Sequence, residues 1–312
     1  MTTGSAAASK GDHTNLDIRA FYESVLKEAT GIRDRIKNGL DLKEPTVLED
    51  LHRAIDEDLI DQLYTHAMSA QGNRVEVPVH AVKVASVSLK IAKGMGYDAK
   101  KLVELGLTAF MENVGMYQVP DNILNKKEAL DQAEMSIIRQ HPEKSYHILS
   151  QMGIEYRWLA ELSLQTHERT NGSGYPKGLK GEQISELASI VGLADNYVAL
   201  ASDRPYRKRF LQSDAVKWIV TEGKALFPTS ILKALLNEIS FFPVGTHVRL
   251  NNMCIGQVLS TEKNQPLRPN IKILYDGHGK KVEKGLAIRL VEDPLLYIKE
   301  ALLIREENQL RV

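Results

Sequence analysis

The chain has 312 residues, and its 40 Lys and Arg balance its 40 Asp and Glu. This balance gives no field that would attract a nucleic acid polymer or an anionic membrane, and no apolar run approaches the ~20 residues that span a bilayer. A single cysteine, Cys254, excludes an internal disulfide framework and favours a reducing cytoplasm, while 43% hydrophobic residues are typical of a globular protein with one to three domains.

Residues 1–15 are small and polar and lack the apolar core of a signal peptide, so we expect a disordered tail there. Residues 16–72 follow with apolar side chains that recur every three or four positions, which predicts an N-terminal helical region. Gly39 and Pro45 divide this region into two or three helices. The amphipathic pattern of these helices leads to the hypothesis that the protein forms a homodimer through them.

A second helical region, 73–242, begins with a largely apolar helix that ends at Gly94-Met95-Gly96, and this composition predicts burial on most sides. Asp131 and Glu134 have the spacing of a capping box, which would open a helix that runs towards His141. Further helices are expected over residues 102–114, 154–166 and 185–201.

The last region, 243–312, has a different character. Its short β-rich runs are divided by Asn251-Asn252 and Asp276-Gly277, which are strand and hairpin signals. We expect a small β unit here, followed by a terminal helix around residues 294–305. The predicted fold class is therefore mainly α, with a helical bundle preceded by an N-terminal helical region and followed by a small β-rich unit.

Residues that can bind a metal ion interrupt the apolar helices of the second region. His80, His141, His167 and Asp195 are four such residues, and Glu76 lies a turn before His80. A single residue of this kind is more often a satisfied core group or a helix cap. Four within one helical domain favour a shared site, because burying unpaired polar groups is costly.

A glycine-rich loop follows His167 and holds four glycines within ten residues, around a lone Tyr-Pro pair. Glycine is costly to order and is kept where the backbone takes a positive φ or approaches another group closely. The loop therefore predicts a binding surface, with an ordinary surface turn as the alternative. Its candidate binding residues are Asn171, Gly172, Gly174, Tyr175 and Pro176. Arg204 and Arg207 are candidates for contacts with phosphates or with a partner's acids, unless they belong to a solvated helix start.

The segment from Thr166 to Gly181 resembles the signature loop of the HD-GYP phosphohydrolases, which usually reads His-His-Glu-x-x-Asp/Asn-Gly-x-Gly-Tyr-Pro-x-Gly-Leu-x-Gly. The resemblance covers roughly residues 75–245, and the β unit is similar to a tail often attached to this family. It implies an all-helical HD fold that holds two or three metal ions. The family's ligands correspond in this sequence to Glu76, His80, His141, His167 and Asp195.

The sequence departs from the family pattern at four positions. Glu112 stands in place of the family's histidine, and Asn113 stands in place of the aspartate that bridges two ions. Met116 replaces a lysine near the phosphate, and Thr166 replaces the first of two histidines.

These departures weaken a two-metal site. A neutral amide bridges two divalent ions poorly, and a threonine hydroxyl is a far weaker transition-metal ligand than imidazole. Methionine cannot neutralise the charge that develops in phosphoryl transfer. Glu112 can still bind metal, so we expect one iron or manganese ion rather than two, held within the set Glu76, His80, Glu112, His141, His167 and Asp195. The alternative is that these groups form a hydrogen-bonded core network without metal.

The resemblance implies a function in bacterial cyclic di-GMP signalling, since hydrolysis of this nucleotide is the family's usual activity. We favour a degenerate member with impaired or lost phosphodiesterase activity. It would act as a nucleotide-responsive binding module or as a docking partner of a diguanylate cyclase domain. One alternative is an active metal-dependent phosphodiesterase that uses Glu112 as a substitute ligand. Another is a hydrolase of this fold that acts on a different phosphate ester.

Overall fold

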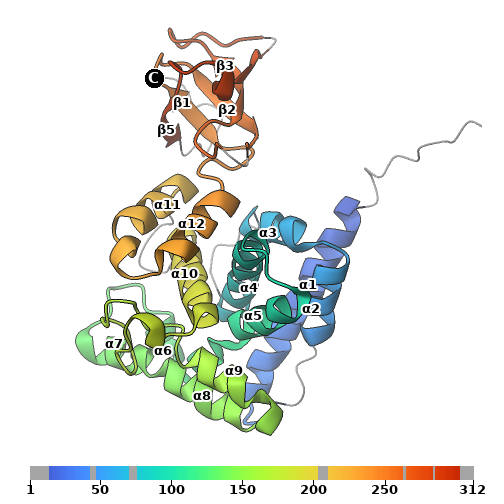
Figure 1. Cartoon of the computed structure of the whole chain (residues 1–312), viewed down its shortest axis with the longest axis vertical. Helices are drawn as coiled ribbons and strands as arrows, with labels where there is room; N and C mark the ends of the chain where they lie inside the picture. Colours follow the sequence, from blue (N-terminus) through green and yellow to red (C-terminus); the bar gives the residue numbers. More distant parts are fainter. Residues whose placement is uncertain are drawn as a thin grey trace, which may run out of the picture.

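A computed structural model describes residues 14–42, 47–69, 76–202, 210–262, 265–283 and 285–302 (Figure 1). These residues form a helical body, and a small antiparallel sheet lies at one end of it, beyond α11 (Gln212–Thr221) and α12 (Thr229–Glu238). This architecture confirms the predicted fold class. Most of the expected tail lies outside the described residues, and its last two residues are helical because α1 begins at Thr14.

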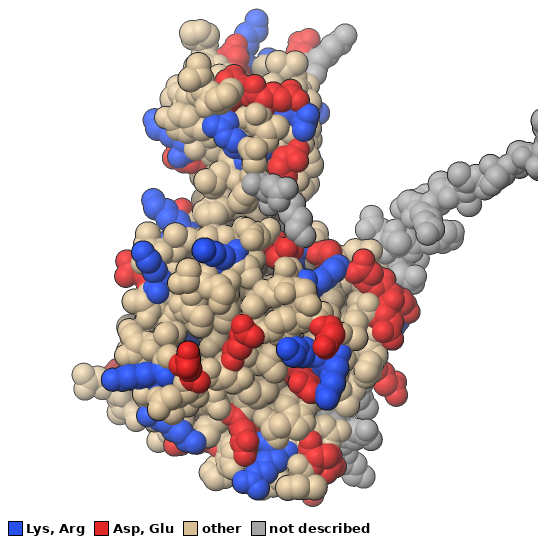
Figure 2. Space-filling model, in the orientation of Figure 1, with Lys and Arg blue, Asp and Glu red and all other residues tan. Residues whose placement is uncertain are grey.

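No helix in the described part of the chain combines the length and the apolar character that crossing a bilayer requires. Figure 2 shows Lys and Arg side chains interspersed with Asp and Glu over the face that it draws. This distribution agrees with the balanced composition of the chain.

Three N-terminal helices pack onto the centre of the helical body: α1 (Thr14–Lys37), α2 (Val47–Asp56) and α3 (Ile60–Ser69). α1 ends before Gly39, whose φ is +66°, whereas Pro45 lies outside the described residues. Phe21, Leu51 and Leu63 are buried in the same core as the central helices. The amphipathic pattern that suggested a homodimer is thus used within one chain, and the boundary after residue 72 stays a prediction.

The centre of the body consists of α4 (Val77–Gly94), α5 (Ala99–Met111) and α10 (Glu186–Ala201). α4 carries Pro78 in its first turn and is buried along most of its length, as its apolar sequence predicts. Asp98 caps α5 by accepting a hydrogen bond from a first-turn backbone N–H at 2.9 Å. His80 lies on α4, Glu112 directly follows α5, and Asp195 lies on α10. These helices therefore bring three of the candidate ligands to the middle of the fold.

A layer of shorter helices follows: η1 (Val114–Gln118), α6 (Asp121–Leu124), α7 (Gln132–Arg139), α8 (His141–Ser150), η2 (Ile154–Tyr156) and α9 (Arg157–Ser163). The predicted capping box at the start of α7 is confirmed. Asp131 accepts a hydrogen bond from the backbone N–H of Glu134 at 2.9 Å and donates its own to the Glu134 carboxylate at 3.0 Å. The helix expected over 154–166 is shorter, because a 3-10 turn precedes α9 and the chain leaves α9 after Ser163.

The C-terminal sheet contains β1 (His247–Leu250), β2 (Ile255–Ser260), β3 (Asn270–Tyr275), β4 (Ala287–Arg289) and β5 (Ile298–Leu302). All neighbouring strands are antiparallel, in the order β4-β3-β2-β1-β5. The expected terminal helix around 294–305 is wrong where the structure describes it, because β5 pairs with β1, with Val248 opposite Ala301. Without β5, the backbone N–H and C=O groups on one edge of β1 would lack partners. The hydrogen bonds that β5 makes with this edge favour a strand over the helix that the apolar spacing predicts.

The sheet has an apolar core separate from that of the helical body, so we expect Ile271→Ala to destabilise the β unit alone. Ile271 is fully buried, and truncation of such a side chain costs about 2–5 kcal/mol. Hydrogen exchange of the β-unit amides should accelerate. Both tryptophans, Trp158 and Trp218, lie in the helical body, so the urea transition of their fluorescence should stay unchanged. An equal shift of that transition would show that the two cores unfold together.

Candidate metal centre

Three buried side chains converge between the end of α5, the start of α8 and the loop after α9. One ligand atom from each of Glu112, His141 and His167 lies within 4.8 Å of the other two. The Nε2 atoms of the two histidines are 2.8 Å apart, and His167 Nε2 lies 3.5 Å from a Glu112 oxygen. We call these three residues the donor trio. It is the one such group of histidines, cysteines and acids in the part of the chain that the structure describes.

The hydrogen bonds of His141 orient its free nitrogen into the donor trio. Its Nδ1 lies 2.8 Å from the carbonyl oxygen of Ile138, and since a carbonyl only accepts, Nδ1 carries the proton. Nε2 then offers a lone pair, and in the absence of metal His167 donates from its own Nε2 across the 2.8 Å contact. A backbone carbonyl in this position is the usual support of a metal-binding histidine.

Two of the departures from the family pattern hold the carboxylate of Glu112. Asn113 donates its side-chain amide to one oxygen at 2.5 Å, and Thr166 donates its hydroxyl to the other at 3.0 Å. Three substituted positions therefore form one hydrogen-bonded group. From the sequence alone they look like independent losses of family metal-binding residues, because Thr166 lies 54 positions after Glu112.

Burial sets the protonation state of the donor trio when no metal is bound. Burial, and after it the charge of Asp195, raises the pKa of Glu112 to about 8. Burial lowers the pKa values of His141 and His167 to about 4. At neutral pH the trio is therefore uncharged, and a metal ion has to displace the proton of Glu112.

A histidine–aspartate pair lies beside the donor trio. His80 Nε2 on α4 is 2.7 Å from Asp195 Oδ1 on α10, and both side chains are largely buried. His80 Nδ1 is also buried, and the described residues give it no hydrogen-bond partner. Because buried polar atoms are seldom left unpaired, this nitrogen fits a site that binds a polar or metallic group.

Glu76 is the candidate ligand that the structure does not bring to this site. It directly precedes α4, and 56% of its side chain is exposed. Its carboxylate lies 3.3 Å from the guanidinium of Arg33 on α1, in an ion pair. The role of Glu76 as a ligand stays a prediction.

A cavity of about 390 Å³ opens beside the donor trio. Its polar lining consists of His80, Asn113, His141, His167, Tyr175, Asp195 and Asn196. Its apolar wall includes Met116, Leu130, Met135, Ile138, Leu200 and Trp218. Trp218 packs against the core of the helical body and also lines this cavity. Arg204 and Arg207 lie outside the described residues.

The glycine loop is held by a buried carboxylate, Glu168, that the sequence analysis did not single out. One oxygen of Glu168 accepts the backbone N–H of Lys177 at 2.7 Å, and the other accepts that of Leu179 at 2.9 Å. Glu168 is only 2% exposed. The one signal in the sequence was its place after His167 in the loop motif, where the family also has glutamate.

Glycine is required at two positions of this loop. Gly172 has a φ of +82°, and a Cβ at Gly174 would lie 2.4 Å from the backbone of Glu168. These observations confirm the predicted positive φ and close approach. The peptide bond between Tyr175 and Pro176 is cis. The ring of Tyr175 stacks on that of His167, with centres 5.0 Å apart and 6° between the planes.

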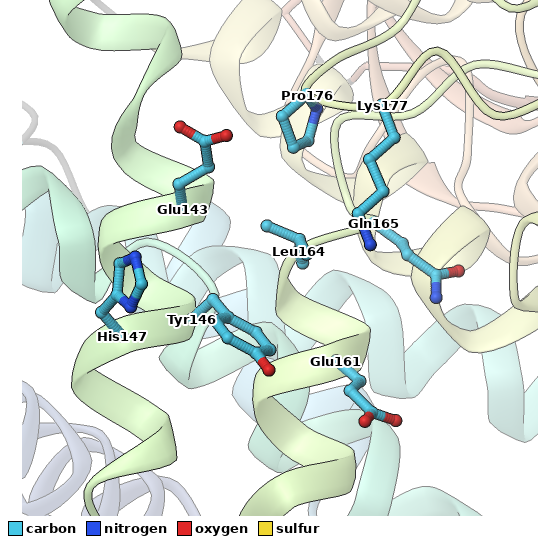
Figure 3. Close-up of a pocket in the computed structure, with 8 residues that line it drawn as sticks. All are labelled: Glu143, Tyr146, His147, Glu161, Leu164, Gln165, Pro176 and Lys177. Carbon is cyan, nitrogen blue, oxygen red and sulfur yellow. The ribbon is translucent and has the colours of Figure 1, made fainter.

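A second cavity, of about 560 Å³, lies next to the same loop (Figure 3). Adjacent loop residues line the two cavities, since Tyr175 lines the first and Pro176 the second. The second cavity is lined by Glu143, Tyr146, His147, Glu161, Leu164, Gln165, Pro176 and Lys177. Its two acids are exposed, and the donor trio lies outside it. The first cavity is therefore the candidate active or binding site.

Comparisons with known proteins place the chain among HD domain proteins. The HD domain family matches residues 57–229, and the KOW domain associated with HD domain matches residues 247–310. Cyclic di-GMP phosphodiesterase PA4108 of Pseudomonas aeruginosa is 31% identical over 202 residues, which are 65% of this chain and 49% of that protein. Cyclic di-GMP phosphodiesterase PdeB of Borreliella burgdorferi is 33% identical over 208 residues, which are 66% of this chain and 54% of that protein. The chain spans about half the length of these curated relatives.

A solved structure shares the architecture. The HDG"Y"P protein Bd1817 from Bdellovibrio bacteriovorus matches with a TM-score of 0.56 over 73% of each chain, at 18% identity. At this identity the likeness concerns the fold alone. It agrees with the helical body described above.

Proposed function

The chain belongs to the HD-GYP family of HD domain proteins, and from this premise we propose that it binds cyclic di-GMP beside one divalent metal ion. We further propose that its phosphodiesterase activity is impaired or lost. The observation that carries the proposal is the donor trio: three ligand atoms meet within 4.8 Å, while two neighbouring substituted residues bind Glu112 instead of facing a second ion.

The surroundings of the donor trio support one ion rather than two. Asn113 uses its amide to hold Glu112 and brings no charge with which to bridge two cations. Glu76 is paired with Arg33 at the surface. Two imidazoles and one carboxylate suit a first-row transition metal, and we propose iron or manganese as in the family.

The chemistry of hydrolysis needs groups that this site has lost. A bound divalent ion would polarise a phosphoryl oxygen and lower the pKa of a coordinated water. Met116 lines the cavity where a lysine would stabilise developing negative charge, and one such contact is worth on the order of 3 kcal/mol. The residues of this chain therefore support binding better than turnover.

The first cavity suits a nucleotide. Its volume of about 390 Å³ lies within the usual range for small-molecule sites, so it can enclose part of a cyclic dinucleotide. Tyr175 and Trp218 line it and offer aromatic surface to a base. His167 stacks on Tyr175, so the glycine loop and the donor trio are in direct contact.

One observation favours an active enzyme as the second candidate. Glu112 lies within the donor trio, and its two oxygens are held by Asn113 and Thr166. A coordinated set of substitutions can preserve a working ligand at this position. A hydrolase for another phosphate ester would need the same ligand.

Metal content and turnover, measured together on protein purified without chelator, test the proposal. We expect about one iron or manganese ion per chain, binding of cyclic di-GMP, and no linear product after addition of manganese or ferrous iron. Two ions per chain with turnover would contradict the proposal and favour the active enzyme.

A variant with the family residues restored provides the matched control. It combines Glu112→His, Asn113→Asp, Met116→Lys and Thr166→His. Gain of a second ion and of turnover in this variant would attribute the lost activity to these four positions. If it folds and binds two ions but stays inactive, the loss lies elsewhere in the chain.

A diguanylate cyclase domain as partner, a homodimer and a location in the cytoplasm stay predictions. Asn171 and Ser173 are exposed residues of the glycine loop, which supports contact with another protein at this point. Co-purification with a diguanylate cyclase domain, lost on replacement of Asn171 and Ser173 by bulky residues, would test the docking role.

A further inference from the structure

The cavity beside the donor trio has no cation in its described lining. Its polar residues are histidines, amides, Tyr175 and Asp195, and no Lys or Arg is among the described residues that line it. A cyclic dinucleotide carries two phosphodiester charges. One can lie at the metal centre, but the other would be enclosed without a partner, which is unfavourable.

Arg139 is a cation at the edge of this cavity. It is the last residue of α7, and its guanidinium lies 5.6 Å from the centre of the Tyr175 ring. Tyr175 in turn stacks on His167, so the same phenol ring contacts both the guanidinium and the donor trio. Arg139 is exposed, and no ion pair ties it to an acid among the described residues.

The backbone around Arg139 is fixed relative to the donor trio. The carbonyl of the preceding residue, Ile138, accepts the hydrogen bond of His141 Nδ1 at 2.8 Å, and the Ile138 side chain lines the cavity. At the other end of α7, Glu134 joins the capping box and lies 2.6 Å from Lys126. The side chain of Arg139 can therefore move, while its backbone is held in place next to the residue that hydrogen-bonds to His141.

We propose that Arg139 binds a phosphate of the bound cyclic dinucleotide, and this inference rests on the proposed function. The planar guanidinium matches two phosphate oxygens and keeps its charge at every relevant pH. An exposed contact with an aromatic ring is weaker than such a pair, so the side chain can leave Tyr175 when a phosphate enters. Leaving would also free one side of the phenol ring for a base. Arg139 would thus supply the charge that Met116 does not.

Binding of cyclic di-GMP to the metal-loaded full chain tests this role. Arg139→Gln should weaken binding by about 10- to 150-fold, the equivalent of one charge-assisted hydrogen-bonded contact. Arg139→Lys, which keeps the charge but not the two-point geometry, should give an intermediate Kd. The difference between wild type and Arg139→Gln should shrink when the salt concentration rises from 50 to 300 mM, because salt screens the charge.

Arg157→Gln is the matched control, since Arg157 is an exposed arginine on α9 that pairs with Glu161 at 3.2 Å. It should bind like wild type, and all variants should keep their metal content. Equal Kd values for wild type and Arg139→Gln would overturn the role of Arg139 while leaving the proposed function intact. So would a loss of affinity in Arg139→Gln that is independent of salt or accompanied by loss of metal. No binding by the wild type would overturn the proposed function and this inference together.

Discussion

Glu112→Gln should empty the metal centre and, in metal-free protein, abolish the loss of stability that wild type shows as the pH becomes alkaline. Glutamine lacks the charge that a metal ligand needs, so metal content should fall to background. Glutamine also resembles the protonated carboxyl group, which is the form that burial favours here, since it raises the pKa of Glu112 to about 8. Glutamine accepts through one oxygen only, so it loses the bond from Asn113 or from Thr166, a cost that does not depend on pH.

The direction of the pH effect follows from the two pKa values. The pKa of Glu112 lies near 4.5 in the unfolded chain and near 8 in the fold. The stabilisation from its bound proton is therefore fully present below pH 4.5 and is lost as the pH rises through about 8. Relative to Glu112→Gln, wild type should lose about 4 kcal/mol between pH 5 and pH 8.5.

Urea denaturation of both proteins in the presence of a chelator, at pH 5, 6.5 and 8.5, measures this difference. His141 and His167 titrate in both proteins, so their contribution largely cancels. Glu143→Gln removes an exposed acid of α8 and should leave both metal content and the pH profile unchanged. A constant stability difference across the pH range would show that Glu112 is ionised in the metal-free fold.

Glu168→Gln should release the glycine loop and weaken nucleotide binding, although residue 168 is no candidate metal ligand. A glutamine offers one acceptor oxygen where the carboxylate offers two, so the backbone N–H of Lys177 or of Leu179 loses its partner. A buried bond to a charged acceptor contributes about 1.5–3 kcal/mol. Exchange of these two amides should accelerate by about 10- to 150-fold.

The affinity for cyclic di-GMP should fall by a similar factor. Tyr175 lies in the chain between Glu168 and the two backbone amides that Glu168 holds, so release of these amides also frees Tyr175. Glu182→Gln is the control, since Glu182 is an exposed acid just after the loop. Metal content should stay at the wild-type level in both variants. Unchanged exchange of Lys177 and Leu179 in Glu168→Gln would show that the glycines alone hold the loop.

Much of the fold was predictable from local sequence patterns. The apolar character of α4, the capping box of α7 and the helix from Glu186 to Ala201 were all predictable, because each depends on residues within a few turns. β5 was mispredicted as helix for the opposite reason. Its state is decided by hydrogen bonding to β1, about 50 residues earlier in the chain, and no local spacing reports this pairing.

The types of residue in the candidate site were predictable, but which of the candidate residues lie in the site was less so. His141 and His167 meet as expected, but the structure pairs Glu76 with Arg33 of α1, which the sequence could not indicate. Glu168 was missed because the amides it holds lie 9 and 11 positions further along, beyond the range of turn and cap patterns.

By itself, the sequence determined the helical character, the glycine loop, and the loss of charge at Asn113 and Met116, since these are properties of single residues and short spacings. The tertiary structure alone decided that Asn113 and Thr166 both bind the Glu112 carboxylate, and that Arg139 lies over Tyr175. Contacts between helices depend on how buried surfaces pack and on which polar groups share one desolvated space. Neither is encoded in the periodicity of a single segment.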